Sequence, residues 1–173
     1  DKNYADAEKI MSELHLANPD DAEINYHFAW LCDVQGKERE AIPYYEAAIE
    51  NGLSGDNLRG ALLGLGSTYR TLGEYQKSVE TLKHGQELFP QANEFPVFLS
   101  MALYNIGESK DAVSLLLKLL LKVTDNEDIL RFKSAIDLYA DDIDKVWLDW
   151  ENGYRLINSD KWFMPGELQK ERI

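Results

Sequence analysis

The residue types that most often carry out chemistry are spread thinly along this chain. Three histidines, His15, His27 and His84, fall in separate segments, and none has a second ligand at metal-binding spacing. We therefore expect surface or packed helix residues and no metal site. The single cysteine, Cys32, belongs to an apolar pattern, so a buried and unreactive thiol is expected rather than a nucleophile. No cofactor is predicted.

Two other features resemble catalytic motifs only superficially. Asp141 and Asp142 form a carboxylate pair, but they lie on the polar side of a helical pattern and are expected to be solvated. The glycine-rich stretch "LGLGSTYRTLG" lacks the preceding strand and the closing Lys-Ser/Thr that a phosphate-binding loop needs. No nucleophile elbow is present. The sequence therefore predicts that the protein is not an enzyme.

Composition points to a helical globular domain with an acidic surface. The 173 residues are 45% hydrophobic, with a formal net charge of −13 and a pI near 4.6. This charge disfavours nucleic acid and anionic membrane surfaces as partners. The longest apolar run, 115–123, is interrupted by Lys118 and Lys122, so no membrane span is predicted. A lone cysteine is typical of a reducing compartment, and we expect the protein to be cytoplasmic.

The sequence contains an internal repeat, and this repeat predicts the helices that would carry any functional side chains. Three phrases share a glycine, a polar step and an apolar helical pattern: "DVQGKEREAIPYYEAAI", "RTLGEYQKSVETLKHGQ" and "YNIGESKDAVSLLLKLL". Their glycines, Gly36, Gly73 and Gly107, are 37 and 34 residues apart. A helix–turn–helix unit with a period near 34 is predicted.

The small and large positions of these units identify the pattern. The second unit is the clearest, with Leu62, Leu65, Gly66 and Tyr69 in its first helix and Ser78, Leu82, Gly85 and Pro90 in its second. Such a pattern resembles the tetratricopeptide repeat (TPR) family over residues 4 to about 124. The phrase "GALLGLGSTYRTLGEY" is similar to a small bacterial three-repeat subfamily without assigned function. The resemblance implies an all-α, right-handed solenoid of antiparallel helix pairs.

The repeat pattern divides the chain into a solenoid, residues 1–150, and an aromatic tail, residues 151–173. The solenoid comprises a half repeat at 3–19, repeats at about 22–55, 59–92 and 93–124, and a C-terminal capping helix at 126–150. The cap is predicted from helical spacing of Ile129, Phe132, Ile136, Tyr139, Ile143, Val146 and Trp150. In the tail we expect a turn at Asn152-Gly153, an irregular aromatic segment and a short helix after Pro165.

Three glycines lie close together in the first helix of the second unit, where each costs about 1 kcal/mol relative to Ala. Gly66 is expected to let the paired helix approach, and Gly73 to end the helix in a left-handed conformation. Gly64 is not explained by the family pattern. It leaves room either for a ligand or for the adjoining helix.

The resemblance implies that the first helices line a concave groove. Its ligand-facing candidates, beside Glu23 and Glu94, are Tyr26, Trp30, Asp33, Leu63, Ser67, Arg70, Val97, Met101 and Tyr104. Arg70 is expected to be the only positive charge there. Some family members clamp a C-terminal carboxylate with Lys and Asn, but Tyr26, Trp30, Leu63 and Ser67 occupy those positions here. We therefore expect an amphipathic helix or extended apolar segment as the ligand.

Two classes of function remain open. The first is a scaffold or adaptor that binds a protein or peptide in this groove. The second is a structural unit that associates with itself, as a homodimer or through its own tail, using Trp147, Trp150, Trp162 and Phe163. A further alternative is that Trp30, Met101 and Tyr104 simply pack against neighbouring helices.

Overall fold

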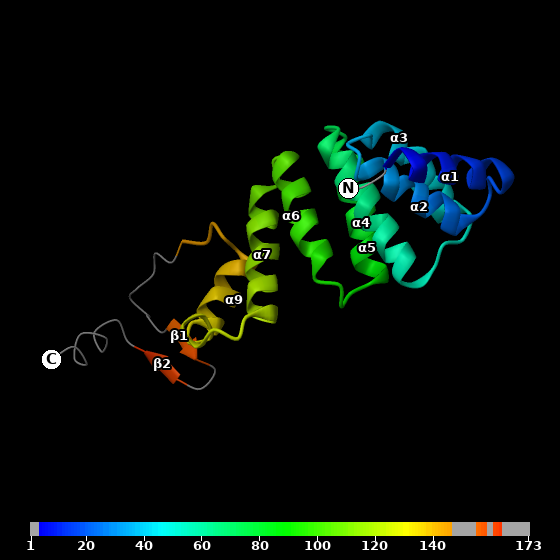
Figure 1. Ribbon diagram of the computed structural model, residues 1–173. Coiled ribbons are helices and arrows are strands. Elements are labelled where there is room, and N and C mark those ends of the chain that lie inside the picture. The colour runs from blue at the N-terminus through cyan, green and yellow to red at the C-terminus, as the bar shows by residue number, and fades with distance from the viewer. Residues whose placement is uncertain (1–3, 147–154, 159–160, 164–173) are drawn as a thin grey trace. The chain divides into compact units, whose positions relative to one another are not determined.

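The computed structural model describes residues 4–146, 155–158 and 161–163 (Figure 1). Helices account for most of the described chain, and a short β-hairpin lies near its C-terminal end. The chain divides into two compact units, residues 1–108 and 109–173. The first helix of the predicted third repeat belongs to the first unit and the second helix to the second. The predicted repeat and domain boundaries stay predictions.

The first unit is a stack of antiparallel helices, which confirms the predicted all-α solenoid class. Its helices are α1 (Tyr4–Ala17), α2 (Ala22–Asp33), α3 (Glu38–Glu50), α4 (Gly55–Thr71), α5 (Tyr75–Leu88) and α6 (Glu94–Asn105). Each helix packs on the next one in sequence. In addition, α2 packs on α4 and α4 packs on α6, so the first helices of successive repeats are neighbours.

The turns between paired helices depend on glycine, as expected. Gly73 has a φ of +81°, the left-handed conformation that L side chains rarely adopt. The Glu74 N–H donates to the Tyr69 carbonyl at 2.9 Å, and the Gly73 N–H donates to the Arg70 carbonyl at 3.1 Å. These bonds satisfy carbonyls that would otherwise be unpaired at the end of α4. Helix α4 therefore ends at Thr71, and α5 begins at Tyr75 and packs antiparallel to it.

The other two glycines of α4 are explained by close approach of neighbouring helices. A Cβ added at Gly66 would lie 2.6 Å from Cγ of Leu82 in α5, which confirms its predicted role. The buried Ser78 hydroxyl also donates to the Gly66 carbonyl, at 2.7 Å. A Cβ at Gly64 would lie 2.5 Å from Oη of Tyr45 in α3. Gly64 therefore makes room for the adjoining helix, which settles the choice left open above.

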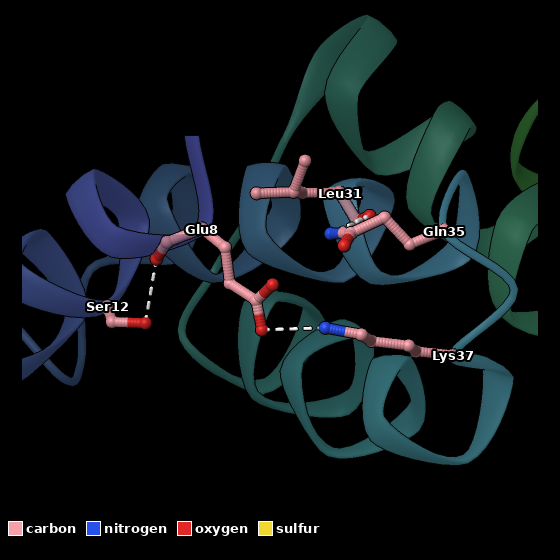
Figure 2. A network of polar contacts seen from close by, with 5 residues as sticks. All are labelled: Glu8, Ser12, Leu31, Gln35 and Lys37. Atoms are coloured by element: carbon pink, nitrogen blue, oxygen red, sulfur yellow. Dashed lines mark hydrogen bonds and ion pairs between the residues drawn. The ribbon is translucent and has the colours of Figure 1, made fainter. Parts of the chain in front are cut away.

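Helix α1 packs against the first pair and is fixed there by a polar contact. Figure 2 shows Lys37, in the turn before α3, reaching Glu8 of α1, with Nζ and Oε1 2.7 Å apart. The Ser12 hydroxyl donates to the Glu8 carbonyl, and Gln35 donates to the Leu31 carbonyl (Figure 2). The apolar side of α1, carrying Tyr4, Ala7 and Met11, packs against the core of the first pair.

The second unit contains α7 (Ser109–Val123), α8 (Glu127–Leu130), α9 (Lys133–Asp141), β1 (Arg155–Asn158) and β2 (Lys161–Phe163). α9 packs on α7, as expected of a capping helix, and β1 packs on α9. β1 and β2 are antiparallel, with Arg155 opposite Phe163 and Leu156 opposite Trp162. We expected an irregular segment there, and the hairpin corrects that expectation. Trp150 and the segment after Pro165 lie outside the described residues.

The extent of the capping helix also differs from the single helix expected over 126–150. It is broken between α8 and α9 and ends at Asp141, after which Asp142 is extended, with a φ of −153°. Asp141, Asp142 and Asp144 together place three carboxylates at this helix C-terminus, where the macrodipole is already negative. The macrodipole disfavours these carboxylates in a continued helix, and Lys118 and Lys110 of α7 pair with Asp141 and Asp144 where the helix ends. The apolar spacing that continues to Val146 therefore does not continue the helix.

Candidate functional site

The side chains predicted to bind a ligand lie on α2, α4 and α6, and two contacts align α4 with α2. Near the start of α4, Asn57 donates to the Glu23 carboxylate. Near its end, the buried Thr68 hydroxyl donates to Asp33 Oδ1 at 2.9 Å. One contact joins the N-terminal ends of α2 and α4 and the other joins their C-terminal ends, so the two helices run parallel.

Two equivalent contacts join α4 to α6. Arg59 Nε lies 3.2 Å from Glu94 Oε1, and Arg70 Nε donates to Asn105 Oδ1 at 2.9 Å. The partners on both sides of α4 are 34 or 35 residues apart, close to one repeat. We call the surface formed by these three parallel helices the first-helix face.

Asp33 is an anchor between helices as well as a candidate ligand-facing residue. Its carboxylate accepts from Thr68 of α4 and from the Tyr45 hydroxyl of α3, the latter at 2.8 Å. Burial raises the pKa of Asp33, and the two hydrogen bonds oppose that rise. Burial, and then the nearby Asp33 charge, also raises the pKa of Tyr45. This network joins three helices beneath the first-helix face.

Two large side chains of the first-helix face, Trp30 and Tyr104, are strongly exposed. Trp30 is 55% exposed and Tyr104 is 69% exposed, so these two rings are not core residues of the described chain. Val97 is 38% exposed, whereas Leu63, Ser67 and Met101 are half-buried. By repeat position, Trp30 on α2 and Met101 on α6 flank the small Ser67 on the middle helix. The face therefore presents large apolar groups on both sides of a smaller central one.

Tyr26 and Arg70, like Asp33, also hold the helices together. A Cβ at Gly60 would collide with the Tyr26 hydroxyl, so this half-buried ring lies close against α4. Burial, and then the charge of Glu23, raises the pKa of Tyr26. Arg70 is not the only positive charge of the face, because Arg59 reaches Glu94 from the same helix. Our expectation of a single cation was wrong.

The sequence interpretation missed the residues that fix the helix spacing: Asn57, Arg59, Thr68 and Asn105. A usable signal existed, because each forms a polar pair with a residue about one repeat away. That separation brings two side chains together only when successive first helices lie parallel and in register. The pairs are therefore recognisable once the repeat has been identified.

Elsewhere, Cys32 and His15 are packing residues, whereas His84, Asp141 and Asp142 are exposed. Cys32 is buried, and burial raises the pKa of its thiol to about 11. The His15 ring lies edge-on to Tyr44, with centroids 5.1 Å apart. Across the described part of the chain, no group of three or more His, Cys, Asp or Glu side chains could hold a metal. None of its helices is long and apolar enough to cross a membrane.

The candidate self-association residues are only partly described. Trp162 and Phe163 lie in β2, where the backbone is defined. Trp147 and Trp150 lie outside the described residues.

Comparison with known protein families identifies a match. The model of the tetratrico peptide repeat family matches residues 22–143, more than half of the chain. No curated protein matches the sequence. Repeat proteins of this family generally mediate protein–protein interactions and are generally non-enzymatic scaffolds. The parallel first helices, the glycine turns and this match agree, and the chain belongs to the tetratricopeptide repeat family.

Proposed function

We propose that this chain is an interaction module whose first-helix face binds a peptide or a partner helix. The observation that carries the proposal is the exposure of Trp30 and Tyr104 on helices whose spacing is fixed by polar contacts. Contiguous exposed apolar patches typically mark interfaces, and aromatic side chains dominate the binding energy of such patches. A preorganised face also spares the partner the cost of ordering it.

The type of partner follows from what the face lacks. Tyr26, Trp30, Leu63 and Ser67 occupy the positions where family members that capture a C-terminal carboxylate carry Lys or Asn. Apolar and aromatic groups instead favour an amphipathic helix, which lays one apolar stripe into a surface between helices. We therefore propose recognition of an internal or helical segment rather than of a free C-terminus.

The test is selection of peptides from a random displayed library on the immobilised chain, followed by titration of the selected peptides. Trp30→Ala and Tyr104→Ala should each weaken binding at least tenfold, as for a hot-spot aromatic worth about 2 kcal/mol. Tyr75→Ala is the matched control, because Tyr75 is an exposed aromatic on α5, a second helix. Equal binding by all three variants and the wild type would place the site elsewhere.

We also keep self-association as a second candidate, because β1 packs on α9 within the second unit. The described hairpin, whose second strand holds Trp162 and Phe163, is thus attached to α9 through β1. Deleting residues 152–173 should lower the unfolding temperature or the oligomeric mass measured by light scattering. If both stay unchanged, the tail has no such role.

The remaining assignments are proposals from composition and resemblance. A net charge of −13 supports a partner that is neither nucleic acid nor an anionic membrane. The single cysteine supports a cytoplasmic location. The phrase "GALLGLGSTYRTLGEY" supports membership of a small bacterial three-repeat subfamily.

A further inference from the structure

The charges of the first-helix face are unevenly balanced. Together with their N-terminal caps, α2, α4 and α6 carry Asp21, Glu23, Asp33, Asp56 and Glu94 against Arg59 and Arg70, a formal charge of −3. The positive N-terminal ends of the helix macrodipoles, about half a charge for each helix, offset part of the negative charge at that end but do not cancel it. The face is therefore acidic as well as aromatic.

The positions of these charges separate two regions. Asp33 and Arg70 lie in the last turns and are held by Thr68 and Asn105. The excess of carboxylates lies at the other end, in the caps and first turns of the three parallel helices.

Two of these carboxylates are well placed to meet a partner. The side chain of Glu23 is 58% exposed and that of Asp56 is 89% exposed. Contacts within the chain leave much of both groups in water. Trp30 and Tyr104, in contrast, lie toward the C-terminal half of their helices. The face therefore offers carboxylates at one end and aromatic rings toward the other.

We propose that the segment bound by the first-helix face is basic and amphipathic. Its Lys or Arg side chains meet Glu23 and Asp56, and its apolar side chains lie on Trp30 and Tyr104. This inference rests on the proposed function and adds the charge of the partner. Rim charges of this kind chiefly set the association rate and the choice of partner, whereas the aromatic groups hold the complex.

The probes are three fluorescein-labelled helical peptides of about 18 residues, or about 27 Å, a length similar to that of α4. All three carry the same leucine stripe, and their polar positions are lysine, glutamine or glutamate. Binding is followed by fluorescence anisotropy at about 0.15 M salt, where long-range attraction to the acidic chain is screened beyond about 8 Å. We expect the lysine peptide to bind most tightly and the glutamate peptide least.

Matched variants separate local charge from net charge. Glu23→Gln/Asp56→Asn keeps the shapes of both side chains and one accepting oxygen in each, and should weaken lysine-peptide binding about three- to tenfold. The control Glu80→Gln/Glu87→Gln removes the same charge from exposed positions on α5 and should change it less than twofold, about the effect of a screened distant charge.

The outcomes distinguish the two levels of the proposal. If lysine and glutamine peptides bind equally, or if both double variants behave alike, the basic partner is excluded. Loss of binding in Trp30→Ala would then still support the interaction face. If no peptide binds, or if Trp30→Ala and Tyr104→Ala bind all peptides as the wild type does, the proposed face itself is wrong.

Discussion

Single residues show how helix packing and the binding face are coupled in this chain. The Tyr45 ring of α3 fills the space beside Gly64 of α4, where a Cβ would otherwise lie. Tyr45 is 2% exposed and is held by its hydrogen bond to Asp33. It therefore cannot swing away to admit a larger residue. The sequence left open whether Gly64 makes room for a ligand or for a helix, and the structure shows that the Tyr45 side chain fills this space.

Gly64→Ala tests this packing. The added Cβ would gain about 1 kcal/mol of helix propensity but would overpack a buried ring, at a cost of about 1–3 kcal/mol. We expect urea unfolding to show a net loss of about 1 kcal/mol. Ser67→Ala, one turn further along α4, should change stability by less than about 0.5 kcal/mol. A Gly64→Ala variant more stable than the wild type would rule out the Tyr45 contact.

The titration of Asp33 gives a second residue-level prediction. Its pKa is raised in the folded state, so the folded chain holds this proton more tightly than the unfolded chain does. The contribution of Asp33 to stability is therefore fully present below its usual pKa of 3.8 and is lost as the pH rises through the raised folded value.

Asp33→Asn, which cannot titrate, isolates this effect. Measured by denaturant unfolding across that pH window, the stability of the wild type relative to the variant should fall as the pH rises. A constant difference would show that burial does not perturb Asp33.

At the level of helices, the spacing of the face depends on polar contacts between successive first helices. Thr68→Val removes the hydroxyl that donates from α4 to Asp33 of α2 while keeping the side-chain shape. We expect a loss of about 1–2 kcal/mol, because a half-buried carboxylate loses a donor. Thr71→Val is the control in the same helix, since Thr71 is exposed and bonds only within α4. Equal losses in both variants would contradict a special role for this contact.

The elements also show which features the sequence could predict. The helices Tyr75–Leu88 and Ser109–Val123 each begin two residues after a repeat glycine, Gly73 or Gly107, so glycine turns and polar steps mark their starts locally. The end of α9 at Asp141 was missed, because the ion pairs of Asp141 and Asp144 with lysines of α7 are contacts between helices that an apolar spacing does not encode. The β-hairpin was missed because its strands, Arg155–Asn158 and Lys161–Phe163, are too short for a clear alternation.

For the chain as a whole, the repeat pattern located the candidate face but not its internal contacts. Equivalent repeat positions identified Trp30 and Tyr104, which the structure leaves exposed. The same positions did not reveal that Asp33 and Arg70 also join helices. Such roles depend on how far a side chain reaches across to another helix, which a periodic pattern does not encode. Position in the repeat thus predicted which residues belong to the face, and the structure shows which of them join helices and which are exposed.

The central claim is that a partner binds on the first-helix face. Its most direct test is photo-crosslinking of a library-selected peptide to a chain carrying benzoylphenylalanine at one chosen position. We expect crosslinking from position 67, where Ser67 is half-buried on α4, the middle helix of the face, and none from position 83, where Lys83 is exposed on α5. Crosslinking from position 83 with none from position 67 would contradict the claim.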